Sequence, residues 1–390
     1  MVRITAAGPA RPRKRWRPAA LWLVTLGLVS MGSLGLVASA HVAEDAGQDM
    51  TVTPTAADEL RLGYFANITH APALIGIQEG LISDALEEGT GTTLRTEVFN
   101  AGPAAIEALN AGAIDAAYLG PGPAINSFAQ SDGESLVIVA GAASGGAQLV
   151  VRPGIDTPGQ LRGTVLATPQ LGGTQDVALR SFLKDRGLSV SPAEDADVSV
   201  NPTANAQTLQ LFRDGAVDGA WLPEPWASRL VLEAGAEVLV DEAELWVGGP
   251  SRNAGQFPTT VLVVNRDFAT AHPATVESLL TGHVDALDWL EDSSEMERVA
   301  GLNAALERTA GEGLRRDVMD RSLEHIEFTV DPLTGIYTTL LQDGVDVGLT
   351  RPADLAGLVD VDPLNRVLDG VSDREQVHSG GLATDAEEAG

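Results

Sequence analysis

An internal repeat in the middle of the chain constrains its fold more than any other feature. Residues 100–123 (NAGPAAIEALNAGAIDAAYLGPGP) recur as residues 203–226 (TANAQTLQLFRDGAVDGAWLPEPW), at an offset of 103 positions. Each copy predicts a helix, then a glycine in the left-handed position that ends the helix (Gly112 or Gly215), then a buried strand. Two copies about one lobe length apart predict two similar lobes.

Each copy also carries an aspartate after a β-branched residue, at the start of the predicted strand. These residues are Asp115 and Asp218. Aspartate at such a position is typical of turns and caps, and this role is favoured over that of a catalytic acid. A helix, a glycine and a strand can also occur together by chance. The duplication is therefore inferred from the shared aspartate and from the proline-rich segment that follows the strand in both copies.

The remaining pattern predicts an α/β protein. From Leu60 onward, strand-like runs such as LRLGYF alternate with helix-like runs such as ALIGIQEGLI, which indicates mainly parallel sheets. A chain of 390 residues can bury the cores of two lobes. The formal net charge of −29 opposes nucleic-acid binding.

The two ends of the chain differ in composition from the middle. Residues 1–40 contain a basic stretch, an apolar stretch and the small-residue site Ala38-Ser39-Ala40, which together predict an export signal cleaved after Ala40. The apolar stretch is also long enough to remain as an uncleaved membrane anchor. Residues 41–58 are expected to form a flexible linker, and residues 372–390 a disordered acidic tail. The protein is therefore expected in the periplasm or at the cell surface.

Several stretches resemble the nitrate/sulfonate/taurine group of ABC-transporter solute-binding proteins. They are LRLGYFANITHAPALIGIQEGLI, FNAGPAAIEALNAGAIDAAYLGPGPAI, TPGQLRGTVLATPQLGGTQDVALRSFLKDRGL and GAVDGAWLPEPWA. The resemblance implies a type II periplasmic-binding-protein fold with two α/β lobes, a five-stranded sheet in each, two crossing strands and C-terminal helices on lobe one. It also implies delivery of a ligand to a permease and its ATPase. Many relatives from Gram-positive cells are lipoproteins, but this chain has no cysteine to carry the lipid.

Mapped onto this chain, the resemblance predicts the boundaries of both lobes. Lobe one comprises 59–149 and 259–354, and lobe two comprises 150–258. The crossings then lie near Val150 and Thr259, and residues 355–371 form a C-terminal packing segment.

Ligands of open α/β sheets bind beyond the carboxyl ends of the strands, where the helices begin. Seven predicted loops lie there, and all seven lack Arg and Lys: 66–72, 100–103, 120–126, 142–147, 168–176, 201–207 and 223–228. Their backbone N–H groups and neutral side chains suit a small anion held by helix N-termini. Glycine and serine at helix starts are also common as simple caps, so the convergence of several loops carries this prediction. Arg252 is the nearby cation that could change it.

Twelve residues of these loops are candidate ligand contacts. The strongest local candidate is the glycine-rich stretch before Gln175, because its glycines let backbone approach a ligand closely. Glu224 could accept a hydrogen bond from an amino or hydroxyl group, and Trp226 could form an apolar wall or belong to the core. The candidates are Asn67, His70, Gly102, Gly120, Pro121, Ser144, Gly173, Thr174, Gln175, Asn205, Glu224 and Trp226.

Three functional classes compete. A related fold makes the thiamine pyrimidine precursor, but that chemistry resembles a single-turnover use of a histidine and a cysteine-rich segment, and this chain has no cysteine. The effector domain of a transcription regulator would need a basic helix-turn-helix in place of the export signal. The third class is a binding protein, which we favour, with a sulfonate- or taurine-like anion as ligand. We expect no catalytic residue, no metal site and no cofactor, and membrane association only through the N-terminal segment or the permease.

Overall fold

The computed structural model describes residues 55–190, 196–246, 256–371 and 374–382. The predicted export signal, most of the predicted linker and Arg252 lie outside the described residues. No helix in these four ranges is long and apolar enough to cross a membrane.

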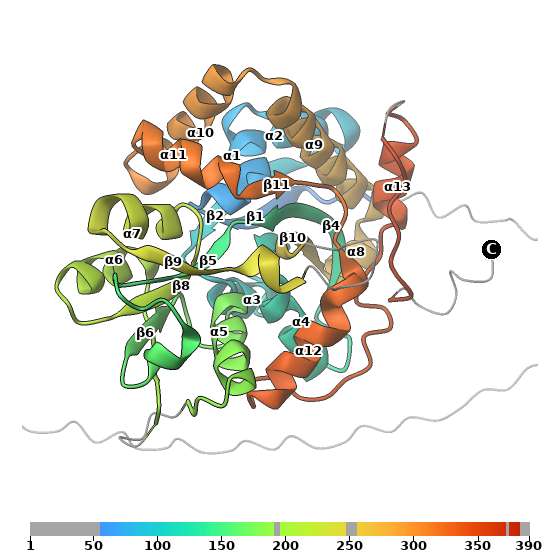
Figure 1. The fold of residues 1–390 in the computed structure, drawn as a ribbon. Helices are drawn as coiled ribbons and strands as arrows, with labels where there is room; N and C mark the ends of the chain where they lie inside the picture. Colours follow the sequence, from blue (N-terminus) through green and yellow to red (C-terminus); the bar gives the residue numbers. More distant parts are fainter. Residues whose placement is uncertain (1–54, 191–195, 247–255, 372–373, 383–390) are drawn as a thin grey trace, which may run out of the picture. The chain divides into compact units, whose positions relative to one another are not determined.

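The described residues form two mixed sheets (Figure 1). The first has the strand order β11-β4-β10-β3-β1-β2, and the second has the order β7-β6-β8-β5-β9. The strands of the first sheet are β1 (Glu59–Phe65), β2 (Thr93–Phe99), β3 (Ala116–Leu119), β4 (Leu136–Gly145), β10 (Pro258–Asn265) and β11 (Ile326–Phe328). Those of the second are β5 (Ala147–Val151), β6 (Val165–Thr168), β7 (Ser199–Pro202), β8 (Gly219–Pro223) and β9 (Glu237–Asp241). We call the elements built on these sheets lobe one and lobe two.

The strand orders confirm the two-lobed α/β fold and show the duplication. In lobe one β1 pairs in parallel with β2 and β3, and in lobe two β6 pairs in parallel with β7 and β8. An antiparallel strand follows in each sheet, β10 beside β3 and β5 beside β8. The first sheet has six strands rather than the five that the resemblance implied, because the short β11 adds to its edge beside β4.

The repeated aspartates have the same structural role in both lobes. The backbone N–H of Asp115 donates to the carbonyl of Arg61 (2.8 Å), and its carboxylate accepts from the N–H of Arg61 (2.8 Å). Asp218 pairs in the same way with Val165, at 2.7 Å and 2.9 Å. Each aspartate therefore joins the start of the repeated strand to the neighbouring parallel strand, so both are structural residues.

The first crossing between the lobes lies at Gly145 and Gly146. Both have positive φ, of +73° and +70°, which favours glycine. A Cβ on Gly145 would lie 2.6 Å from the carbonyl oxygen of His325, so close approach excludes a side chain as well. The crossing therefore precedes the predicted boundary at Val150, which lies inside β5.

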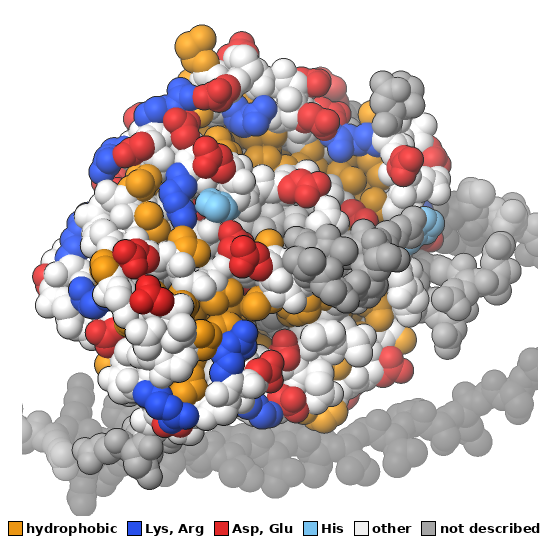
Figure 2. All heavy atoms as spheres, in the orientation of Figure 1, with side chains coloured by type: hydrophobic (Ala, Val, Ile, Leu, Met, Phe, Trp, Pro, Cys, Tyr) orange, Lys and Arg blue, Asp and Glu red, His pale blue; other side chains and the backbone are white. Residues whose placement is uncertain are grey.

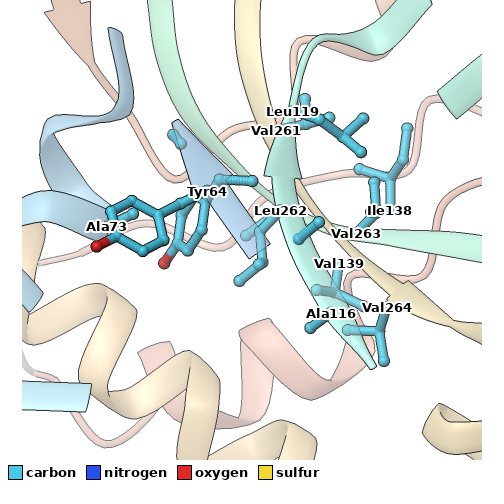
Figure 3. Packing of buried hydrophobic residues seen from close by; sticks show 14 of the residues in the cluster. Tyr64, Ala73, Ala116, Leu119, Ile138, Val139, Val261, Leu262, Val263 and Val264 are labelled. Carbon is cyan, nitrogen blue, oxygen red and sulfur yellow. The ribbon is translucent and has the colours of Figure 1, made fainter. Parts of the chain in front are cut away.

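The helices cover both faces of the sheets. In lobe one, α1, α2, α9 and α10 lie together on one face, and α3 and α4 lie on the other (Figure 1). The apolar residues of β1, β3, β4 and β10 pack between these layers (Figure 3). The helices are α1 (Ala71–Gln78), α2 (Leu81–Thr90), α3 (Gly102–Asn110), α4 (Pro121–Gln130), α5 (Thr174–Asp185), α6 (Asn205–Arg213), α7 (Trp226–Ala234), α8 (Arg266–Ala271), α9 (Pro273–Asp292), α10 (Glu295–Ala310), α11 (Arg316–Glu324), α12 (Tyr337–Asp346) and α13 (Asp362–Leu368).

The C-terminal helices pack on lobe one, as the resemblance implied, and two of them also reach lobe two. Asp343 of α12 accepts a hydrogen bond from Ser181 of α5 (2.8 Å). Arg321 of α11 donates to Gln148 of β5 (2.8 Å). These helices therefore link the two lobes outside the crossing strands.

The acidic tail does not behave as expected over 374–382. Val377 is buried, and its N–H donates to Oδ1 of Asn365 (2.9 Å). Nε of Arg374 donates to Asp288 of α9 (2.7 Å). The prediction of disorder from residue 372 is therefore wrong for this stretch, because an apolar side chain and a charge pair fix it against lobe one.

On the face shown in Figure 2, basic side chains lie among acidic ones rather than in a single basic patch.

Candidate ligand-binding site

Six junctions between a strand and the following helix converge between the lobes. Three belong to lobe one, where β1, β2 and β3 lead into α1, α3 and α4, and three belong to lobe two, where β6, β7 and β8 lead into α5, α6 and α7. Residues of all six junctions line a cavity of about 30 Å³. This is the edge of both sheets at which parallel strands end, so the duplicated lobes present equivalent edges to each other.

The N-cap residues of the helices around the cavity do not cap the first N–H groups of their own helices. The N-cap residues of α3, α4, α5 and α6 form no side-chain capping bond among the described residues. Two of these residues, Gly120 and Gly173, have no side chain and adopt extended backbone. Uncapped N–H groups at helix starts carry partial positive charge, so the cavity offers hydrogen-bond donors to an anion.

His70 supplies a neutral donor to the same cavity. It is buried, and the N–H of Phe65 donates to its Nδ1 (3.3 Å), so the ring proton lies on Nε2. Burial lowers the pKa of His70 to about 3. The ring is therefore uncharged at neutral pH, and its Nε2–H remains available as a donor.

Hydrogen bonds cross the cavity from one lobe to the other. The N–H of Gly122 in α4 donates to Oγ1 of Thr174 at the start of α5 (3.2 Å). The indole Nε1–H of Trp226 in α7 donates to Oδ1 of Asn67 in lobe one (3.0 Å). Both bonds require the lobes to be close together, so the structure is a closed arrangement.

Comparison with known sequences identifies the family of this chain. The sequence model of the NMT1-like family matches residues 54–304, more than half of the chain. The chain belongs to the NMT1-like family.

Several curated and solved relatives of this NMT1-like protein are named as binding proteins. It is 26% identical over 229 residues to the taurine-binding periplasmic protein of Escherichia coli K12, covering 56% of this chain and 66% of that protein. The match thus spans just under two thirds of that relative. Similar solved structures include the alkanesulfonate-binding protein SsuA of Xanthomonas axonopodis pv. citri bound to MOPS, with 23% identity, TM-score 0.60 and coverage of 76% and 96% of the two chains. They also include the nitrate-binding protein NrtA of Synechocystis PCC 6803, with 16% identity, TM-score 0.63 and coverage of 82% and 90%.

These similarities confirm the predicted resemblance to the nitrate, sulfonate and taurine group and the periplasmic-binding-protein fold. The NMT1-like protein shares this fold with the solved structures, and its strands form two mixed sheets.

Most of the sequence-predicted site residues meet at the cavity. The residues that line it come from both lobes, as convergence of the loops required. They are Asn67, His70, Gly102, Gly120, Gly173, Thr174, Gln175 and Asn205.

Four predicted residues do not line the cavity. Pro121 is the first residue of α4, next to the lining residue Gly120, and Trp226 bonds Asn67 beside the cavity. Ser144 lies in β4, where its hydroxyl accepts from the N–H of Phe257 (3.3 Å). In each case a partner within the fold occupies the group or the backbone directs it elsewhere.

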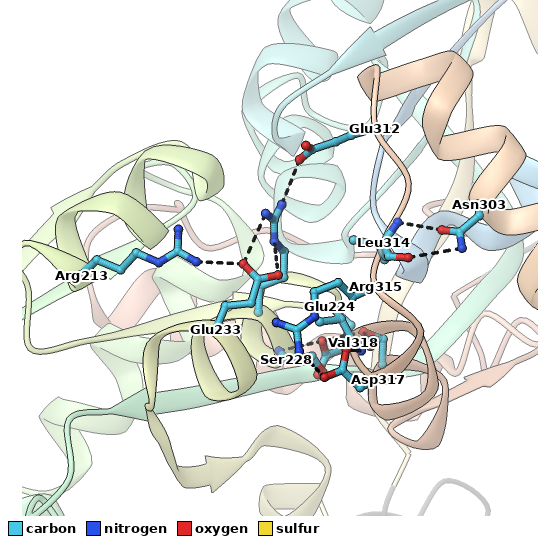
Figure 4. Close-up of polar contacts among 12 residues, drawn as sticks. Arg213, Glu224, Ser228, Glu233, Asn303, Glu312, Leu314, Arg315, Asp317 and Val318 are labelled. Atoms are coloured by element: carbon cyan, nitrogen blue, oxygen red, sulfur yellow. Dashed lines mark hydrogen bonds and ion pairs between the residues drawn. The ribbon is translucent and has the colours of Figure 1, made fainter.

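Glu224 is the fourth, and its carboxyl is committed to α11 and α7. One oxygen accepts from Arg321 (3.0 Å), and the other accepts from the N–H of Ser228 (3.0 Å) and from Ser322 (3.2 Å). Figure 4 shows Glu224 and Ser228 beside the start of α11. Burial raises the pKa of Glu224 despite the nearby guanidinium. The hypothesis that Glu224 accepts from an amino group of the ligand therefore lacks geometric support.

A chain of ion pairs adds a further link at the surface (Figure 4). Glu233 of α7 pairs with Arg213 (3.0 Å) and with Arg229 (3.3 Å), and Arg229 reaches Glu312 in the loop before α11 (3.4 Å). Arg213 and Glu312 at the two ends of this chain are exposed, so their pairs contribute little stability, but the chain connects α7 to the loop before α11.

Sequence reasoning missed eight lining residues. Most lie inside the predicted loops, where proline or a small residue gave no separate signal. Phe65 and Thr259 lie outside those loops, at the end of β1 and in β10, and only the fold brings them to the cavity. The missed residues are Phe65, Thr69, Asn100, Ala101, Pro123, Pro169, Pro223 and Thr259.

No group of three His, Asp or Glu side chains suited to a metal ion occurs within the described ranges.

Proposed function

We propose that this NMT1-like protein is the extracytoplasmic solute-binding subunit of an ABC importer, which captures a small anion of the sulfonate type and catalyses no reaction. One observation carries the proposal: the cavity between the lobes is lined by helix starts whose N-cap residues supply no side-chain cap, and no Arg, Lys, Asp or Glu lines it within the part of the chain that the structure describes. Such a site binds through backbone N–H groups and neutral side chains.

Capture depends on contacts from both lobes. A ligand shifts a two-state equilibrium only by its differential affinity for the two states, and the cavity exists where both lobes meet. Ligand bound to the starts of α3 and α5 would therefore favour the closed arrangement that Trp226 and Asn67 join. We place lobe one at 59–144 with 259–354 and lobe two at 147–258, on either side of the first crossing at Gly145 and Gly146, because β5 belongs to the second sheet.

The location and partner follow from the relatives and the N-terminus. The taurine-binding relative is named as periplasmic, and residues 1–40 predict an export signal. We therefore place the protein outside the cytoplasmic membrane, where it would deliver its ligand to a permease with its ATPase.

A thermal-shift screen of residues 41–390 tests the proposal, since a ligand that binds only the native state raises the melting temperature. The probes are propane-1-sulfonate, taurine, nitrate, bicarbonate and an aminopyrimidine. We expect a sulfonate or a smaller anion to raise the melting temperature of the wild type. The matched variant Asn205→Leu keeps the side-chain size but removes a polar group from the cavity, so it should lose that increase.

Two other outcomes would contradict the proposal. Stabilisation by the aminopyrimidine alone would favour the alternative of a protein related to thiamine-precursor synthesis. An anion effect that persists unchanged in Asn205→Leu would place the anion outside this cavity.

A further inference from the structure

The charge content of the cavity bears on which anions can enter it. Among the described residues, no carboxylate and no cationic side chain lines it, and the sole titratable lining residue, His70, is held in its neutral form with Nδ1 bonded to Phe65. The electrostatic environment is therefore set by the helix starts, which all present their positive ends.

The two nearest carboxylates along the chain are unavailable to a ligand. Asp176 follows the lining residue Gln175, and its oxygens accept from Thr168 (2.8 Å), the N–H of Gly172 (3.0 Å) and Arg180 (3.0 Å). Both Asp176 and Glu224 are fully buried, and each is paired with an arginine. Neither can turn toward the cavity without leaving that arginine unpaired.

An unpartnered amide shows that the cavity is prepared for a polar ligand. Asn205, the first residue of α6, is 7% exposed and lines the cavity, and its Oδ1 has no hydrogen-bond partner within the described chain. A buried acceptor without a partner is destabilising, so a ligand that donates to it would be favoured. An amide can accept from a hydroxyl group, but it offers no charge to balance an ammonium group.

We infer that the site selects a compact anion without any cationic group and discriminates against an aminated anion such as taurine. This inference rests on the proposed function and narrows its substrate class. An ammonium group in the cavity would lose its hydration, would lie near the positive ends of several helices and would find no carboxylate. The discrimination thus arises from the absence of a counter-charge among the lining residues.

Three ligands of equal heavy-atom count isolate this effect. Taurine, isethionate and propane-1-sulfonate share a two-carbon sulfonate and end in an ammonium, a hydroxyl or a methyl group. Titration calorimetry at pH 7.5 should give taurine a dissociation constant at least tenfold higher than either of the other two. Isethionate should bind at least as tightly as propane-1-sulfonate because its hydroxyl can donate to Asn205.

A matched pair of variants tests the cause. Asn205→Asp places a carboxylate in the cavity with almost no change in shape, and should lower the ratio of the taurine constant to the propane-1-sulfonate constant at least tenfold. Asn126→Asp is the control, since Asn126 also has a buried Oδ1 without a partner in the described residues but does not line the cavity. That variant should leave the ratio unchanged.

The results distinguish a failure of the inferred selectivity from a failure of the proposed anion capture. Taurine binding as tightly as propane-1-sulfonate to the wild type would overturn this inference and leave the proposed anion capture standing. An unchanged ratio in Asn205→Asp would also overturn it. Failure of all three sulfonates, nitrate and bicarbonate to bind would overturn the proposed function and this inference together.

Discussion

The indole Nε1–H of Trp226 donates to Oδ1 of Asn67 at 3.0 Å, and this bond joins the second lobe to the first beside the cavity. The bond forms only when the lobes are closed. It therefore couples the closed arrangement to two residues that lie 159 positions apart in the sequence.

Replacing Trp226 with Phe tests that coupling. The variant keeps an aromatic ring but removes the donor, and a typical hydrogen bond contributes about 0.5–1.5 kcal/mol. We expect ligand affinity to fall by about 2-fold to 12-fold. X-ray scattering of the wild type should show a smaller radius of gyration with ligand than without. The Trp226→Phe variant should reach the same smaller radius only at a higher ligand concentration. Met296→Ala, at a 75% exposed position, is the control and should change neither quantity.

Gly120→Ala should weaken binding by blocking closure. The backbone of Gly120 (φ −74°) accepts alanine, but the new Cβ would overlap Oγ1 of Thr174 in the other lobe. We expect affinity to fall by about tenfold or more, equal to about 1.4 kcal/mol. Thr174→Ala removes the overlapping hydroxyl. Adding Gly120→Ala to the Thr174→Ala variant should therefore reduce ligand affinity less than adding it to the wild type. Equal costs would show that the two residues do not meet in solution.

Glu242 should make the protein less stable at alkaline pH. Burial raises its pKa from 4.5 to about 8, and its carboxyl accepts from the indole of Trp221 (2.8 Å). A raised carboxyl pKa contributes stability that is present below pH 4.5 and is lost as pH rises through about 8. Glu242→Gln should remove this dependence, which can reach about 1.4 kcal/mol per pH unit in that window. Chemical denaturation of both proteins at pH 6 and pH 9 measures it, and parallel losses in the two would contradict the assignment.

The repeated aspartates should matter for stability and not for binding. Asp115→Asn should destabilise the protein by about 1–3 kcal/mol, because a buried charge-assisted pair is weakened. Asp218→Asn should cost less, since its side chain is 34% exposed against 8% for Asp115. Urea unfolding measures both. A loss of ligand affinity with unchanged stability would instead assign these aspartates to the site.

The predicted export signal has its own test. N-terminal sequencing of protein purified from its native host should begin at His41, because the basic, apolar and Ala-Ser-Ala segments predict cleavage after Ala40. A chain beginning near Met1 would indicate an uncleaved anchor.

Features that depend on local pattern could be predicted from the amino-acid sequence. The repeat of 100–123 at 203–226 predicted two lobes of one design, and the structure gives both the same strand order and the same aspartate contact. Gly173 and Thr174 were the strongest local candidates because two glycines before a helix let the backbone approach a ligand closely, and both line the cavity.

Contacts between distant segments, which no local pattern predicts, determine which polar groups have a hydrogen-bond partner. From the sequence, Glu224 was a candidate ligand contact, but its carboxyl accepts a hydrogen bond from Arg321, which lies 97 positions later. By contrast, Oδ1 of Asn205 has no hydrogen-bond partner in the described chain. The composition of residues 374–382 predicted disorder, but in the structure Val377 bonds to Asn365 of α13 and Arg374 bonds to Asp288 of α9. The physical reason is common to these cases: helix and strand periodicity is set by near neighbours, while the partner of a charge or an amide comes from whichever distant segment the fold brings within hydrogen-bond reach.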